Sequence, residues 1–196
     1  MNQWLFDQIN AFARATPWLH AVAQIYAGFG VILFAGLLLG GWWIARQTGE
    51  VSRVAAAITA GGATLLAVAV NQPIVHAFNG ARPYTTLPHI LVLADRSTDP
   101  SFPSDHATMA GAVAVGLWFV SRRLGIVAAS AALLMAFARV YIAAHYPADV
   151  AAGLLLGGLV AALTWLLVRR PLTRLAGALA GTRLRPVLVA TDAQVS

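Results

Sequence analysis

Residues 139–168 read RVYIAAHYPADVAAGLLLGGLVAALTWLLV, and this stretch indicates the fold class of the 196-residue chain. Its part from 148 to 168 is almost entirely apolar and matches the roughly 20 residues that a helix needs to cross a hydrocarbon core of about 30 Å. An arginine, a histidine and an aspartate lie at or just before the start of this run. The stretch therefore predicts a membrane-spanning helix with a polar cluster at its beginning.

Four other apolar runs of similar length precede it, at 21–45, 54–76, 104–121 and 124–144. Apolar residues make up 59% of the chain and charged residues only 10%, against roughly 25% charged in an average soluble domain. No run shows the alternating segments of about 10 residues that are typical of a membrane β-barrel. We therefore predict an all-α, multi-pass membrane helical bundle with five transmembrane helices.

The two ends of the chain differ from this transmembrane domain, which we place at 21–170. Apolar residues recur at helical spacing beside polar ones within 1–20, which predicts an amphipathic helix lying in the membrane interface. These apolar residues are Trp4, Leu5, Ile9, Phe12 and Ala13. The segment has neither a basic start nor a signal-peptide cleavage pattern, so we expect it to be retained. Residues 171–196 are basic, and we expect them to form a weakly structured cytoplasmic tail that lies on the membrane surface or is partly disordered.

All 13 basic residues are arginines, and the five predicted spans place nine of them on one side of the membrane. The nine are Arg46, Arg53, Arg122, Arg123, Arg169, Arg170, Arg174, Arg183 and Arg185. Because arginine accumulates in cytoplasmic loops, the other side, which holds all five histidines, is predicted to be extracytoplasmic. This topology also explains the net charge of +6, so we expect no nucleic-acid partner. The chain has no cysteine, which excludes disulfides, a thiolate nucleophile and a zinc–thiolate site.

Three short segments place polar residues at the predicted outer membrane boundary. They are Arg82-Pro83, Pro103-Ser104-Asp105-His106 and the segment from Arg139 to Asp149. The first two lie near the ends of the only long polar connection, at about 77–103, and the third includes the turn between the fourth and fifth spans. We therefore expect the three segments to converge on one site, although they are far apart in the sequence.

Ser104 follows a proline and precedes an apolar run, which is the pattern of a residue that caps the start of a helix. The free backbone N–H groups of the first turn, including those of Asp105 and His106, would then point outward and attract an anion. The serine hydroxyl adds one more donor. Considered alone, Ser104 is equally well explained as an ordinary helix cap.

Arg82 and Arg139 lie where a guanidinium is costly, since insertion of arginine near hydrocarbon costs a few kcal/mol. Their planar N–H donors match the oxygens of a phosphate group in pairs. Arg82 alone is also explained as a loop arginine that reaches toward water. Arg139, inside an apolar span, is harder to explain without a function.

His145 and Asp149 are four residues apart, and Pro147 suits the first turn of a helix, so the carboxylate could accept the imidazole N–H. A carboxylate on one ring nitrogen leaves the other nitrogen free to attack phosphorus. His106 could give a proton to the departing oxygen and then accept one from water. Alone, His145 and Asp149 also fit an ordinary capped helix start, but the whole set in this order favours a phosphate-handling site.

These residues resemble the motif of the type 2 phosphatidic acid phosphatase superfamily. That motif has a basic residue leading to Arg-Pro, then Pro-Ser-x-His, then an arginine followed six positions on by histidine and four further by aspartate. The chain supplies matching residues within about 71–160: Arg82-Pro83, PSDH at 103–106, Arg139, His145 and Asp149.

The resemblance implies a helical membrane phosphatase that needs no metal or other cofactor. His145 would form a phosphohistidine, Asp149 would orient it, and His106 would act as general acid and base. The phosphoryl oxygens would be held by Arg82, Ser104, the backbone at Asp105, and Arg139. The chain departs from the motif at Val75, where the family has a lysine, and at Ala138, where it often has a serine. His76, Arg96 or a neighbouring amide could replace the missing donor.

Within the superfamily, three segments of the chain are most similar to bacterial undecaprenyl-diphosphatases of the bacitracin-resistance type. They are NQPIVHAFNGARPY, DPSFPSDHAT and ARVYIAAHYPADV. This resemblance implies a bacterial cytoplasmic-membrane enzyme that removes the terminal phosphate of undecaprenyl diphosphate on the extracytoplasmic side. Phosphatidate, phosphatidylglycerophosphate or another lipid phosphate remain alternative substrates, and a lipid phosphotransferase is an alternative activity. A membrane transporter is a remote alternative. The oligomeric state stays open.

Overall fold

All five predicted apolar runs are helical in the computed structural model, which describes residues 1–190. The main helices are α2 (His20–Gln47), α3 (Val51–Phe78), α5 (Asp105–Val120), α6 (Arg122–Tyr141) and α7 (Pro147–Leu179). The other elements are α1 (Asn2–Ala15), the 3-10 turn η1 (Pro17–Leu19), α4 (Pro83–Thr86) and α8 (Arg185–Leu188). Residues 1–190 contain no strand, and the predicted all-α class is confirmed.

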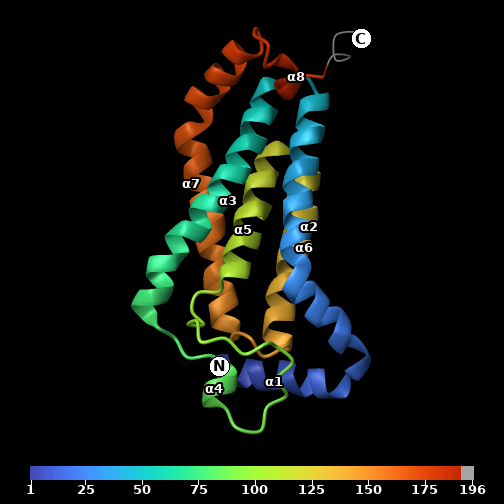
Figure 1. Ribbon diagram of the computed structural model, residues 1–196, viewed down its shortest axis with the longest axis vertical. Helices are drawn as coiled ribbons and strands as arrows, with labels where there is room; N and C mark the ends of the chain where they lie inside the picture. Colours follow the sequence, from blue (N-terminus) through green and yellow to red (C-terminus); the bar gives the residue numbers. More distant parts are fainter. Residues whose placement is uncertain (191–196) are drawn as a thin grey trace.

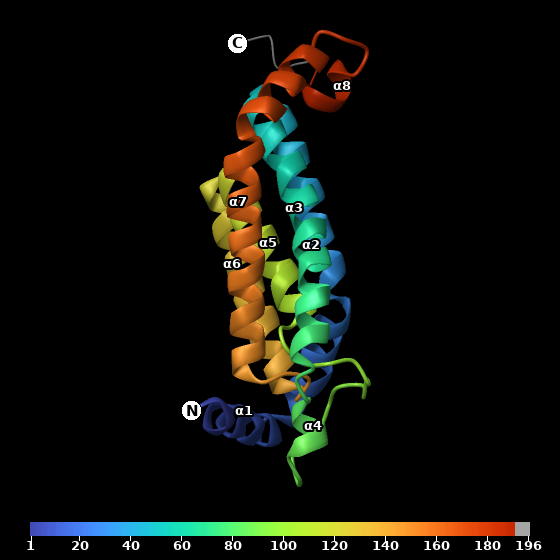
Figure 2. The ribbon, with the colours of Figure 1, turned by 90° about the vertical axis from the view of Figure 1, so that its left-hand side faces the viewer.

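Helix α5 lies at the centre of the bundle, with α3, α6 and α7 packed against it (Figures 1 and 2). Four segments are long and apolar enough to cross a membrane: Pro17–Gln47, Val51–Thr86, Arg122–Tyr141 and Pro147–Leu179. Helix α5 has only 16 residues, or about 24 Å at 1.5 Å per residue. The predicted bundle is therefore present, but the run at 104–121 forms a shorter central helix. Its length is not set by the bilayer, because other helices surround it.

Small residues allow the backbones of α5 and α7 to touch. A Cβ atom added to Gly157 would lie 1.8 Å from the carbonyl oxygen of Thr108, and one added to Gly111 would lie 2.3 Å from that of Leu154. At Gly153 the added atom would meet the carbonyl oxygen of Ser104 at 2.6 Å. Close backbone approach is how helices associate where lipid tails are as apolar as leucine. This contact fixes the start of α5 against the start of α7.

Helix α1 lies across one end of the bundle (Figure 2). Phe6 is fully buried, and its ring lies 5.4 Å from that of Tyr146. The buried Asn10 side chain donates to the carbonyl of Leu91 at 2.8 Å and accepts from its N–H at 3.0 Å. The predicted N-terminal helix is therefore present and anchored to the loop before α5. Exposed apolar side chains such as Trp4 are consistent with its predicted place in the membrane interface.

The segment after residue 170 is more ordered than the sequence suggested. Helix α7 continues past Pro171 to Leu179, and α8 follows at the opposite end of the molecule from α1 (Figure 1). Ala176 and Leu188 are buried against the ends of α2 and α3, and the N–H of Ala190 donates to the carbonyl of Arg46 at 3.2 Å. The prediction of a weakly structured tail is thus wrong up to residue 190, because its apolar residues pack on the bundle. Residues 191–196 of that predicted tail lie outside the described residues.

We expect Gly157→Ala to lower the stability of the protein by about 1–3 kcal/mol, because the new methyl group overlaps the backbone of α5. The measurement is the midpoint of thermal unfolding in detergent. Gly177→Ala on the same helix is the matched control, since nothing lies within 4 Å of its Cβ position. Gly177→Ala should leave stability unchanged or slightly higher, and an equal loss in both variants would contradict the proposed backbone contact.

Candidate active site

The three polar segments singled out in the sequence meet at the end of the bundle that α1 covers. Arg82 caps α4, Ser104 precedes α5, Arg139 lies in the last turn of α6, and Asp149 lies in the first turn of α7. Figure 1 shows α4 and the starts of α5 and α7 at this end. A cavity of about 220 Å³ opens among them. Its lining residues are Arg82, Asp95, Ser97, Asp99, Pro100, Pro103, Asp105, His106, Arg139 and His145.

His145 lies in the connection between α6 and α7 and is 3% exposed. Its Nδ1 atom is 2.9 Å from the carbonyl oxygen of Ser101, which can only accept, so Nδ1 carries the proton. The Arg139 guanidinium donates to the Nε2 atom at 3.2 Å. The ring is therefore neutral, and the lone pair of Nε2 accepts from Arg139, which lines the cavity together with His145.

Burial lowers the pKa of His145 below its ordinary value, and the nearby Arg139 and Arg82 guanidinium groups act in the same direction. The Asp149 carboxylate opposes this shift. Burial is the dominant cause, so the neutral ring that the hydrogen bonds define is also the form that the surroundings favour. A neutral imidazole is the nucleophilic form of histidine.

Asp149 contacts His145 less directly than we predicted. Its Oδ2 atom lies 3.7 Å from Nδ1, beyond hydrogen-bond distance, and the Ser101 hydroxyl donates to this same oxygen. The Ser101 oxygen is also 3.2 Å from Nδ1 of His145. A second donor to Oδ2 is the N–H of Tyr146, at 2.9 Å, so the carboxylate also accepts from the backbone at the start of α7. Ser101, at 1% exposure, thus connects the carboxylate to the imidazole.

Arg82 and Arg139 bring two guanidinium groups to the cavity. Arg82 donates to the carbonyl oxygens of Asp99 at 2.8 Å and Ala144 at 3.1 Å, so it also holds the loop before α5 against the turn that carries His145. The Nε atom of Arg139 is buried and has no hydrogen-bond partner in residues 1–190. A phosphate oxygen is the type of acceptor that would satisfy such donors.

Ser104 is the residue before α5, as expected for a cap, but its hydroxyl makes no capping hydrogen bond. The side chain is fully buried beside the cavity, rather than in its lining, and its oxygen is without a partner among the described residues. Its N–H donates to the carbonyl of Asp149 at 3.1 Å, which ties α5 to α7. A buried, unpaired hydroxyl at this place is suited to contact an anion.

The Asp105 carboxylate is held by helix α3. Its Oδ1 atom accepts from the side-chain amides of Asn71 at 2.6 Å and Gln72 at 2.9 Å. The carboxylate is therefore occupied by these two amides. The backbone N–H groups at the start of α5, where His106 lines the cavity, are the part of this segment suited to bind an anion. The role of the two amides was not predicted, although Asn71 and Gln72 stand out as neighbouring polar residues near the end of an apolar run.

Neither of the two side chains named above as replacements for the family's lysine lies in the lining of the cavity. Val75 is 5% exposed within α3, and neither His76 nor Arg96 lines the cavity. Arg96 instead lies over the ring of Tyr84, 5.7 Å from its centroid. Among the described residues, the positive charges that line the cavity are therefore the two guanidinium groups.

Sequence reasoning also missed Ser101. A serine in a polar loop containing several prolines is unremarkable, and nothing in its spacing links it to His145, 44 residues away. Only the folded loop brings its hydroxyl and carbonyl oxygen between the histidine and the aspartate.

A neutral, oriented imidazole, a second histidine and two arginines around one cavity in a helical membrane bundle define a site suited to phosphoryl transfer. Comparison with known proteins agrees with this class. The chain belongs to the PAP2 superfamily, whose family model matches residues 56–172. Membership in this family of lipid phosphatases supports a phosphatase activity.

Relatives of known name match most of the chain. It is 27% identical to undecaprenyl-diphosphatase BcrC of Bacillus subtilis (strain 168), over 83% of this chain and 79% of that protein. It is 29% identical to the putative undecaprenyl-diphosphatase YbjG of Escherichia coli (strain K12), over 80% of this chain and 77% of that protein. The crystal structure of Aquifex aeolicus LpxE has a similar fold, with a TM-score of 0.56 and 23% identity, covering 83% of this chain and 93% of that one.

We expect Ser101→Ala to lower the kcat of phosphate release about tenfold or more with little change in KM. The variant loses a hydrogen bond to the Asp149 carboxylate, and hydrogen bonds to charged groups contribute about 1.5–3 kcal/mol. The ring nitrogen is then less firmly aligned, while the arginines that hold phosphate are unchanged. The measurement is steady-state kinetics of the purified protein.

Ser97→Ala is the matched control for this prediction. Ser97 lines the same cavity, but its hydroxyl donates to Asp99 and does not contact His145. A kcat loss of equal size in Ser97→Ala, or a change confined to KM in Ser101→Ala, would show that Ser101 does not position the histidine.

Proposed function

We propose that this protein removes the terminal phosphate from undecaprenyl diphosphate and releases undecaprenyl phosphate and inorganic phosphate. The observation that carries the proposal is the neutral His145 ring, held at Nδ1 by Ser101 and facing Arg139 through Nε2. The substrate is proposed because two relatives that match most of the chain are named as undecaprenyl-diphosphatases, one of them as putative.

In the first step, the lone pair of His145 Nε2 attacks the terminal phosphorus, and the bond to the bridging oxygen breaks. His106 gives a proton to that departing oxygen, which leaves as undecaprenyl phosphate. The phosphorylated ring is positively charged and keeps its proton on Nδ1, which donates a hydrogen bond to the Ser101 carbonyl, and the Asp149 carboxylate compensates the charge. Arg82 and Arg139 stabilise the phosphoryl oxygens, and the buried Ser104 hydroxyl adds a donor.

In the second step, His106 removes a proton from water as the water oxygen attacks phosphorus. The bond from phosphorus to Nε2 breaks, inorganic phosphate leaves, and His145 returns to its neutral form. The two guanidinium groups supply the positive charge, so the proposed reaction uses no metal ion or other cofactor.

The proposal is tested with the purified protein on undecaprenyl diphosphate and phosphatidate, with and without a chelator. We expect phosphate release to be faster from undecaprenyl diphosphate and unaffected by the chelator. His145→Ala should lose activity by a factor of more than about 100, because the nucleophile is absent. Terminally labelled substrate should leave an acid-labile label on the wild type and none on His145→Ala.

The acid side of the pH profile gives a further readout of the same step. Neutral His145 is the active form, and burial places its pKa below the ordinary value of about 6.5. The fall in kcat/KM that protonation of His145 causes should therefore begin only below pH of about 6.5.

Other outcomes would change specific parts of the proposal. Preference for phosphatidate would overturn the choice of substrate, and loss of activity with the chelator would contradict the metal-independent mechanism. Transfer of the label to an added lipid acceptor, in place of water, would make the protein a phosphotransferase. Full activity in His145→Ala would exclude a phosphohistidine intermediate.

We propose further that the protein lies in a bacterial cytoplasmic membrane with this site on the extracytoplasmic side. The nine arginines assigned to the cytoplasmic side belong to the ends of α2 and α7, the starts of α3 and α6, and the segment around α8, while the site lies at the opposite end.

Because the chain has no cysteine, Thr98→Cys provides a single label near the site. We expect a membrane-impermeant thiol reagent to label it in intact cells. Ser52→Cys, at the start of α3, is the matched control and should react only after the cells are opened. Labelling of Ser52→Cys in intact cells, with Thr98→Cys reacting only in opened cells, would contradict the proposed topology.

A further inference from the structure

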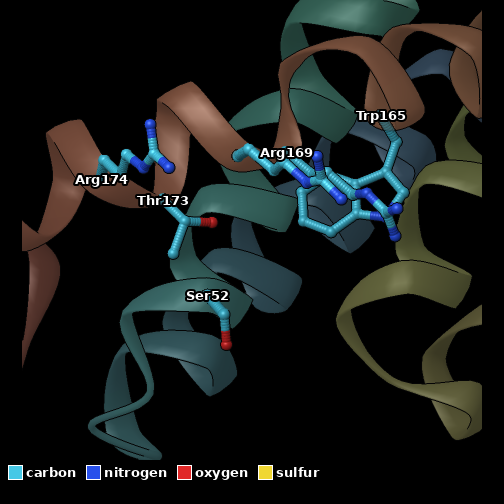
Figure 3. A pocket seen from close by; sticks show the side chains of 6 residues that line it. Ser52, Trp165, Arg169, Thr173 and Arg174 are labelled. Atoms are coloured by element: carbon cyan, nitrogen blue, oxygen red, sulfur yellow. The ribbon is translucent and has the colours of Figure 1, made fainter.

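A second polar cavity lies at the end of the bundle opposite the candidate active site. It is a groove of about 480 Å³ between the last turns of α7 and the first turn of α3. Its lining residues are Ser52, Trp165, Arg169, Arg170, Thr173 and Arg174 (Figure 3). None of these residues takes part in the proposed phosphatase reaction, so the groove needs its own explanation.

The position of the groove along α7 matches the boundary between hydrocarbon and headgroups. Just before it, Leu163, Leu166 and Leu167 are 49%, 56% and 78% exposed, which suits a surface that faces lipid tails. Trp165 is partly buried, and its ring stacks on Phe119 at 5.7 Å. Tryptophan is enriched at this level of the membrane, and the arginines follow within one turn of the helix. The groove is therefore at the depth where lipid phosphate groups lie.

The charge of the groove is not compensated by the protein. Arg169, Arg170 and Arg174 are exposed and make no ion pair or side-chain hydrogen bond within residues 1–190. The one carboxylate paired with an arginine in the described part of the chain is Glu50, which contacts Arg53 at 2.9 Å. Guanidinium groups that line one groove without a carboxylate partner are suited to bind a phosphate group.

Two residues with hydroxyl groups also line the groove. Ser52 lies in the first turn of α3, where backbone N–H groups have no partner within the helix, and it adds a hydroxyl. Thr173 adds a hydroxyl from α7, and Figure 3 shows it on the side of α7 where Ser52 lies. Arginine accumulation on the cytoplasmic side explains why these charges are present, but not why three of them share one groove with two hydroxyls.

We propose that this groove binds the phosphate headgroup of an anionic membrane phospholipid, which is not the substrate of the enzyme. The acyl chains would lie along the exposed leucines of α7, and the phosphate oxygens would accept from the arginines and the hydroxyls. The lipid thereby joins the ends of α3 and α7. This proposal depends on the membrane fold and is independent of the proposed reaction at His145.

The test compares two double variants of the full-length protein that remove the same charge from the same end of the bundle. Arg169→Ala/Arg174→Ala removes two groove arginines, whereas Arg122→Ala/Arg123→Ala removes two exposed arginines at the start of α6 that do not line the groove. Native mass spectrometry counts the phosphatidylglycerol that each protein retains, with phosphatidylcholine as the neutral-headgroup control.

We expect the groove variant to bind phosphatidylglycerol about tenfold more weakly than the wild type, and the α6 variant to bind it normally. Phosphatidylcholine should bind weakly to all three proteins. Equal losses in both variants would overturn the proposal in favour of general electrostatic attraction, and no loss in either would also overturn it.

Two further measurements keep the proposal falsifiable. Thr173→Glu adds a negative charge to the groove without removing an arginine, so it should also weaken phosphatidylglycerol binding, even if the double variant does not fold. Inorganic phosphate at millimolar concentration should not displace the lipid. Displacement by inorganic phosphate would identify a site for free phosphate in place of a lipid headgroup.

Discussion

The direct backbone contact between α5 and α7 is the constraint on which the rest of the structure depends. Gly111, Gly153 and Gly157 leave no room for a side chain where the two helices meet. Because the helices touch, the N–H of Ser104 reaches the carbonyl of Asp149. The Pro-Ser-Asp-His segment and the His145 segment are thereby held together, although they belong to different parts of the chain. In lipid, such contact replaces the hydrophobic driving force that would pack helices in water.

Around this contact, the protein satisfies its buried polar groups with backbone atoms of the long loop before α5. Arg82 donates to loop carbonyls, and the carbonyl of Ser101 accepts a hydrogen bond from Nδ1 of His145. The loop is exposed at residues 95–99, but several of its backbone groups that face the site are paired with the side chains of Arg82 and His145. The same contacts that stabilise the loop also set the tautomer of the histidine. The same hydrogen bonds therefore stabilise the folded loop and orient the His145 ring for its proposed role as nucleophile.

Much of this architecture could be predicted from hydropathy, because apolar runs of membrane length must form helices. The predicted central run at 104–121 gave a shorter helix, since hydropathy does not distinguish a helix enclosed by other helices from one that faces lipid. The basic segment after 170 was predicted to be only weakly structured, because its arginines and Pro171 obscured the apolar residues that pack on the bundle. Ala176 and Leu188 are buried there only because the end of α2 and the start of α3 lie at the same level.

For the site, the sequence by itself determined which residues can carry the chemistry: Arg82, Ser104, His106, Arg139, His145 and Asp149 are polar or charged in places where an apolar chain excludes such groups. Only the tertiary structure decided how they are connected. It placed Ser101 between His145 and Asp149, fixed Asp105 through Asn71 and Gln72, and left Val75 without a nearby cationic substitute. The reason is physical: residue type and local spacing determine what a side chain can do, whereas a hydrogen bond between segments far apart in the sequence depends on how the helices pack.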